Sequence, residues 1–202
     1  MKMPFFASFI IFLIWVSYEI SRSRRRGEKA RQTYWDRENA ANSTRRKSLD
    51  GLNYITIPFD SLPMDILKDE ERVSECHKTL HDLADFPIVN FTGLTNTDLK
   101  LEYGAPNIDL LMRYDQNYTT LVRTLQQWAQ KLYDAGYIPE TKQILEFAVS
   151  TGTDVSGSYR LLANIYAAEG ENGKITKLME QAQTLKSASR NIIVRTLQEF
   201  DS

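Results

Sequence analysis

The sequence contains few of the residues on which compact catalytic and metal sites depend. Its 202 residues include one cysteine, Cys76, and two histidines, His77 and His81. A single cysteine cannot form an intramolecular disulfide, which is ordinary for a protein of a reducing compartment. A Gly-rich phosphate loop, a GxSxG turn and a CxxC pair are also missing from the sequence. We therefore predict neither an enzymatic activity nor a cofactor.

The two histidines are the one constellation that suggests a metal. Because His77 and His81 are four residues apart, a helix would project both from one face, where they could share an ion. The residues between them are Lys78, Thr79 and Leu80, so the glutamate of a metalloprotease HExxH motif is missing. A surface histidine pair beside a buried cysteine is the simpler interpretation, and we predict no metal site.

One long apolar run stands near the start of the sequence. Residues 3–18 read MPFFASFIIFLIWVSY and carry no charge. A helix needs about 20 residues to cross a hydrocarbon core of roughly 30 Å, so the run is short, but Lys2 and Arg22 can extend it by reaching toward headgroups. We predict a transmembrane anchor over residues 1–21, in contact with the membrane through residues 3–20.

Basic residues follow the run at once and indicate its orientation. Six cations lie within the eleven residues after Ile20: Arg22, Arg24, Arg25, Arg26, Lys29 and Arg31. Since the flank richer in Lys and Arg stays inside, we expect a single-pass protein of the cell membrane with its N-terminus outside and its C-terminal part in the cytoplasm. A cleaved signal peptide and a helix lying in the interface are the alternatives, although no A-x-A-like cleavage site follows the run.

Charge is strongly segregated along the rest of the chain. Residues 22–47 hold ten Lys/Arg against three Asp/Glu, whereas residues 48–202 hold fourteen against twenty-two. We predict that residues 22–50 form a basic juxtamembrane stalk, in which Arg22–Arg31 either only set the topology or contact anionic lipid. The acidic remainder argues against nucleic acid as a partner, because phosphate binding needs a basic face.

The middle of the chain, residues 51–106, is predicted to be irregular with one amphipathic helix. Residues 52–63 alternate apolar and polar side chains, but Pro58 restricts them to a sheet edge or to no sheet. Residues 69–85 place apolar side chains three and four apart, which predicts a helix that ends before Pro87. A shorter helix is expected over residues 98–103.

Self-similarity at a fixed period dominates the C-terminal half. Six positions of one unit recur 34 residues later: Trp128, Ala129, Leu132, Gly136, Leu145 and Ala148 match Leu162, Ala163, Tyr166, Gly170, Met179 and Ala182. The two units resemble the tetratricopeptide repeat, a pair of antiparallel helices, over about residues 120–186. Thr141 and Ile175 stand where that family prefers alanine. The second unit also resembles a pentatricopeptide repeat, but two acidic units are poorly suited to an RNA strand.

The resemblance implies a mainly α protein whose residues 107–202 form a TPR-like helical repeat domain. Residues 188–200 are expected to form a C-terminal capping helix over the last unit. Upstream, residues 108–125 are expected to supply a cap helix followed by the start of the first repeat helix.

The resemblance also implies a concave groove that binds a protein or peptide. The positions carried over to this sequence are Arg123, Gln126, Gln130, Tyr133, Asp134, Arg160 and Asn164. We therefore expect a membrane-anchored cytoplasmic interaction or scaffold module. The alternatives are a structural homo-oligomeric membrane protein and a metal-dependent enzyme or regulator that uses residues 70–110.

Overall fold

The computed structural model describes residues 3–200, with side chains from Ser8 onward. Over this range the chain forms eight α-helices and two short 3-10 helices, and its only β pairing is an isolated bridge between Tyr54 and Val89. The prediction of a mainly helical fold is confirmed. Contacts divide the chain into two compact units, one made of residues up to Lys47 together with Asn96–Asn107, the other of Ser48–Thr95 with the chain from Ile108 onward.

The first unit joins the end of a long helix to a short one through polar contacts. It contains α1 (Met3–Asn42), α3 (Asn96–Tyr103) and the 3-10 helix η2 (Ala105–Asn107). The Glu38 carboxylate of α1 accepts hydrogen bonds of 2.6 Å from Thr97 Oγ1 and from Lys100 Nζ of α3. Among the described side chains of α1 and α3, the buried apolar ones are Ala41 and Leu99. Charge-assisted hydrogen bonds therefore contribute a large share of the contact between these two helices.

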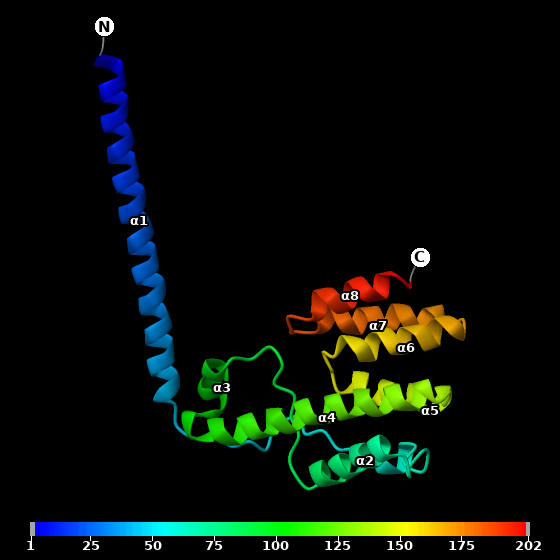
Figure 1. Cartoon of the computed structure of the whole chain (residues 1–202). Helices are drawn as coiled ribbons and strands as arrows, with labels where there is room; N and C mark the ends of the chain where they lie inside the picture. Colours follow the sequence, from blue (N-terminus) through cyan, green and yellow to red (C-terminus); the bar gives the residue numbers. More distant parts are fainter. Residues whose placement is uncertain (1–2, 201–202) are drawn as a thin grey trace. The chain divides into compact units, whose positions relative to one another are not determined.

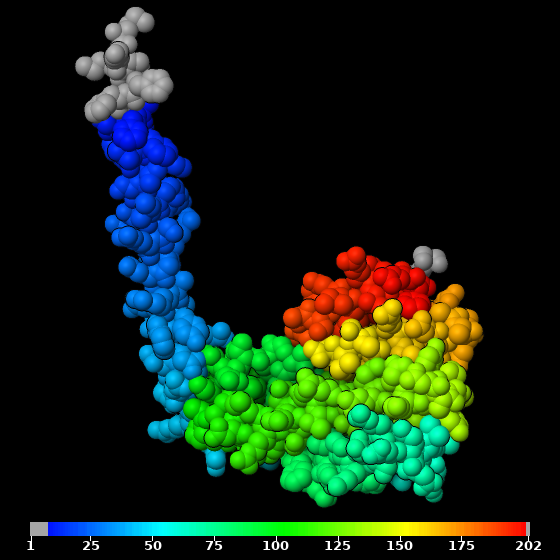
Figure 2. Space-filling view, viewed as in Figure 1, coloured from blue at the N-terminus to red at the C-terminus, as the bar shows by residue number. Residues whose placement is uncertain are grey.

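The first half of α1, dark blue in Figure 2, carries exposed apolar side chains. Large side chains that are 44–68% exposed follow one another along it: Phe9, Ile10, Ile11, Phe12, Leu13, Ile14, Trp15, Tyr18 and Ile20. Among residues with described side chains, none of the helices combines the length and the apolar character needed to cross a bilayer. The expected anchor covers residues 1–21, of which residues 1–2 and the side chains of residues 3–7 lie outside that range. A membrane anchor over residues 3–20 thus stays a prediction.

The second unit is a stack of six helices (Figure 1). Neighbours along the stack are α2 (Glu71–Ala84), α4 (Ile108–Asp134), α5 (Ile138–Ser150), α6 (Ser156–Ala168), α7 (Asn172–Thr184) and α8 (Arg190–Gln198), and each packs on the next. The 3-10 helix η1 (Phe59–Ser61) precedes α2. One apolar core runs through the unit, and its fully buried side chains include Leu80, Trp128, Leu145 and Leu162.

The 34-residue period of the sequence is also a period of the helices. Helices α5 and α7 begin and end 34 residues apart, and α6 repeats the second half of α4 at the same interval. Gly136 and Gly170 follow α4 and α6 with φ of +85° and +72°, a left-handed conformation in which glycine avoids the strain of a side chain. At Thr141, where the repeat pattern prefers alanine, the buried hydroxyl donates to the carbonyl of Tyr137 at 2.7 Å.

Three expectations about element boundaries need correction or refinement. Residues 108–125 do not form a cap helix followed by a new one, because α4 continues unbroken to Asp134 and buries Tyr118 and Leu121 where a break would fall. The short helix expected over residues 98–103 is present as α3, which begins at Asn96, but residues 51–106 are divided between the two units. The stalk expected over residues 22–50 is helical only to Asn42.

Two helices predicted from periodicity are confirmed with small changes at their ends. Helix α2 spans Glu71–Ala84, and the Glu70 carboxylate caps it by accepting a 2.8 Å hydrogen bond from the Val73 amide. The expected last helix spans Arg190–Gln198 and buries Ile193 and Leu197.

Candidate functional site

A groove of about 520 Å³ lies between α2 and α4. Most of its lining residues have polar side chains, and they come from the two facing helices. The lining residues are Arg72, Glu75, Cys76 and Thr79 of α2, and Thr124, Gln126, Gln127, Gln130 and Lys131 of α4. Amides and hydroxyls outnumber charged groups here, so the groove offers both hydrogen-bond donors and hydrogen-bond acceptors.

The helical periodicity explains why these residues form the walls. Helix α2 buries Val73, Cys76 and Leu80, α4 buries Leu125 and Trp128, and the two helices pack on each other. Residues one position away from a buried residue are rotated by about 100° around the helix axis, so they lie at the margin of the buried face. The same apolar spacing that packs α2 on α4 therefore sets polar side chains along the margin of the contact.

Gln126 is held in place from a third helix, α6. Its Oε1 accepts a 2.6 Å hydrogen bond from the hydroxyl of Ser158. A Cβ atom built on the neighbouring Gly157 would lie only 3.0 Å from Gln126 Nε2, so glycine at this position leaves room for the amide. Ser158 fixes the orientation of the amide, and Gln126 Nε2 has no hydrogen-bond partner among the described residues, so its N–H groups are open to a ligand.

Gln130 presents the opposite end of its amide. Its Nε2 donates a 2.8 Å hydrogen bond to Oδ1 of Asp134, which leaves its oxygen as an acceptor. Gln126 and Gln130 are one helical turn apart, a rise of about 6 Å. Alternate residues of an extended chain are about 6.6 Å apart and point the same way. The two amides are thus spaced to bind the backbones of two alternate residues of an extended peptide. The oxygen of Gln130 would accept from the N–H group of one residue, and the N–H groups of Gln126 would donate to the carbonyl oxygen of the other.

Charges of both signs border the groove, and their mutual ion pairs are long. Arg72 and Glu75 approach to 3.9 Å, as do Lys131 and Glu70, and all four side chains are well exposed. Such pairs hold each other weakly, so they are available to a partner. At the base, burial raises the pKa of the Cys76 thiol, and nearby Glu75 and Glu70 add to the shift. The thiolate required of a nucleophile is therefore disfavoured.

The structure brings together two of the seven residues expected in a groove. Gln126 and Gln130 line the α2–α4 groove. Asp134 contacts Gln130 without lining the groove, and Tyr133 is half-buried against the apolar core. The other three side chains lie exposed elsewhere on α4 and α6: Arg123, Arg160 and Asn164. The sequence predicted α2 as a helix, but nothing in its pattern indicated that α2 packs on α4 and supplies the second wall.

The two histidines are engaged in different contacts. The His77 ring meets Trp128 edge-on at 4.8 Å between centroids, whereas the His81 ring stacks on Phe59 at 4.5 Å. Burial lowers the pKa of His77, and the neighbouring His81 lowers it further. Among residues 8–200, no three His, Cys, Asp or Glu side chains gather closely enough to hold a metal ion.

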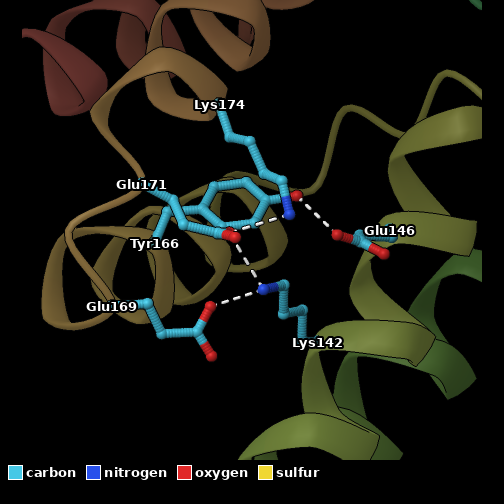
Figure 3. A network of polar contacts seen from close by, with 6 residues as sticks. All are labelled: Lys142, Glu146, Tyr166, Glu169, Glu171 and Lys174. Atoms are coloured by element: carbon cyan, nitrogen blue, oxygen red, sulfur yellow. Dashed lines mark hydrogen bonds and ion pairs between the residues drawn. The ribbon is translucent and has the colours of Figure 1, made fainter.

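A cluster of polar contacts joins α5, α6 and α7, and both of its lysines are paired with glutamates (Figure 3). Lys142 of α5 pairs with Glu169 and, at 2.9 Å, with Glu171, while Lys174 reaches Glu171 at 2.8 Å. Hydrogen bonds to the two glutamates raise the pKa of Lys142. The Tyr166 hydroxyl donates to Glu146 at 2.8 Å, and both lysines lie over its ring. Lys142 is thus held as a cation and is unsuited to act as a base.

Comparisons with protein families, with curated proteins and with solved structures find no match for this chain. The likeness to tetratricopeptide repeats therefore depends on the 34-residue period alone and stays a prediction.

Proposed function

We propose that this protein is a membrane-attached interaction module that binds an extended peptide segment of a partner protein in the α2–α4 groove. The observation that carries the proposal is the paired arrangement of Gln126 and Gln130, one amide with free donors and the other with a free acceptor. Main-chain recognition of this kind gives affinity to an extended strand of varied sequence. The exposed Arg72, Glu75 and Lys131 would then select among peptides by charge.

The apolar half of α1 supports the membrane part of the proposal. A contiguous exposed apolar surface of this size is unusual for a protein in water and marks a site that another phase or chain covers. Attachment through residues 3–20, with the C-terminal part in the cytoplasm, agrees with the run of cations that follows. A module held at a surface needs only modest groove affinity, since tethering raises the effective concentration of its target.

Selection of peptides from a displayed random library tests the groove. We expect the full chain in detergent to enrich extended segments, whose affinity is then measured by fluorescence anisotropy. Replacing Gln126 or Gln130 with alanine should weaken binding about fivefold each, the effect of one hydrogen bond of roughly 1 kcal/mol.

Gln116→Ala supplies the matched control, because Gln116 lies on the same helix but outside the α2–α4 groove. It should leave the affinity unchanged. Peptides that bind equally well to all three alanine variants would contradict the assignment of the groove.

A structural homo-oligomer is a second candidate, and the same exposed apolar half of α1 favours it. In that case the chain is an oligomer in detergent, and Ile11→Glu, at a position 68% exposed, should convert it to a monomer. Light scattering measures the molar mass of both. A monomeric unmodified chain would remove this alternative.

A further inference from the structure

The cations that follow the apolar half of α1 surround the helix. At 100° per residue, Arg22, Arg25, Arg26 and Lys29 share one face, while Arg24 and Arg31 lie on the opposite one. The six side chains are exposed. Within the described part of the chain, the only ion pair of this group joins Arg22 to Glu19 at 3.4 Å. We call these six residues the cationic collar.

The apolar segment before the collar has no polar face. Phe9 to Val16 are eight consecutive apolar residues, more than two full turns of α1. A helix that lies in a membrane interface has one apolar and one strongly polar face, and this segment lacks the second. The pattern instead suits a helix immersed on every side, with its axis directed through the interface.

An immersed segment brings the collar to headgroup depth on all sides of the helix. Arg22 follows Ile20 by two residues, and the collar extends over about 14 Å of helix rise. Phosphate oxygens are the ligands that arginine binds best, through bidentate hydrogen bonds. Cations next to an anionic leaflet each gain roughly fivefold in affinity.

From this geometry we infer that the cationic collar, Arg22, Arg24, Arg25, Arg26, Lys29 and Arg31, binds the headgroups of anionic phospholipids around α1. The inference rests on the membrane attachment proposed above, and it assigns to the collar a lipid partner in addition to any effect on topology. Anionic lipid would accordingly be enriched around the helix relative to the surrounding bilayer.

Quenching of Trp15 by brominated lipid tests this inference. Trp15 precedes Arg22 by about 10 Å along the helix, within reach of lipids that contact the collar. The full chain carries Trp35→Phe in every sample, so that only Trp15 and the fully buried Trp128 fluoresce. All vesicles contain the same fractions of phosphatidylcholine and phosphatidylglycerol, and only the lipid that carries bromine differs.

We expect brominated phosphatidylglycerol to quench Trp15 more than an equal amount of brominated phosphatidylcholine, by a margin that corresponds to about fivefold enrichment. The triple variant Arg24→Gln, Arg25→Gln, Arg26→Gln should remove the difference. A matched variant, Lys78→Gln, Arg113→Gln, Lys186→Gln, changes the net charge equally at exposed positions outside α1 and should preserve it.

Two other outcomes distinguish lipid binding by the cationic collar from the membrane attachment of α1. Equal quenching by the two brominated lipids would overturn the lipid assignment and leave the membrane attachment standing. No quenching by either lipid would refute the attachment itself.

Discussion

Helix α4 and the first half of α1 are both rich in large apolar side chains, yet they bury them to opposite extents. In α4 these residues recur every three or four positions and lie on faces that α2 and α5 cover. In α1 they follow one another without interruption, and Phe9 to Trp15 are all exposed. The difference teaches that the spacing of apolar residues, more than their number, decides whether a helix joins a protein core.

The largest effect is expected from a matched pair of tryptophans in these two helices. Trp128 of α4 is fully buried, whereas Trp15 of α1 is 58% exposed. Trp128→Ala should lower the free energy of unfolding of the second unit by about 3–5 kcal/mol, since it opens a cavity in the core. Trp15→Ala should leave that free energy unchanged.

Urea denaturation followed by far-UV circular dichroism measures both variants. Equal losses of stability in the two variants would mean that α1 unfolds together with the core of the second unit. That result would contradict the contrast drawn between α1 and α4.

A second pair compares the polar contacts of the two units. Lys142 and Lys100 have side chains that are 18% and 19% exposed, and each pairs with glutamate. Lys142→Met should cost about 1 kcal/mol while α5, α6 and α7 stay packed through their apolar core. Lys100→Met should release α3 from α1, because polar contacts make up so much of that interface.

Hydrogen exchange resolves the two outcomes. Amides of residues 96–103 should exchange several-fold faster in Lys100→Met, whereas those of α5–α7 should lose only a little protection in Lys142→Met. Lys177→Met, at an exposed lysine of α7 with no ion pair in the described residues, is the control and should change neither region. If the amides of α3 exchange at the same rate with and without Lys100→Met, apolar contacts are sufficient to hold α3 on α1.

The smallest effect concerns pH and the interface between α2 and α4. Burial holds the pKa of His77 below its usual 6.5, with His81 adding to the shift and Asp65 opposing it. The unfolded chain therefore takes up a proton first as the pH falls through 6.5, and the second unit loses stability below that value. In His77→Phe, which keeps a ring against Trp128, this part of the acid dependence should disappear.

Urea midpoints measured between pH 8 and pH 5 test the point. A slope in His77→Phe equal to that of the unmodified chain would assign the acid sensitivity to other groups.

Periodicity was sufficient to predict most of the helices and much of the core. The spacing of Val73, Cys76 and Leu80 predicted α2, and the 34-residue interval predicted the glycines that follow α4 and α6. The continuity of α4 was missed because residues 117–120, Asn-Tyr-Thr-Thr, are weak helix formers, a weakness that the burial of Tyr118 and Leu121 offsets. Local preference cannot include such a tertiary contribution.

The candidate site was predicted only in part, for a related reason. Gln126 and Gln130 were expected in a groove from their repeat positions, but Thr79 and Arg72 belong to a helix some 50 residues earlier in the chain. No spacing within one helix reveals which distant helix will pack beside it, or that Ser158 will orient the amide of Gln126.

By itself the sequence determined that the chain is helical, where its helices repeat, and that its apolar residues near the start have no polar face. Only the tertiary structure decided that α2 packs on α4, that two glutamines meet in one groove with opposite ends of their amides free, and that Lys142 is neutralised across three helices. The physical reason is range: helix formation depends on neighbours three and four residues away, whereas a groove depends on the contacts by which separate helices bury their apolar faces together.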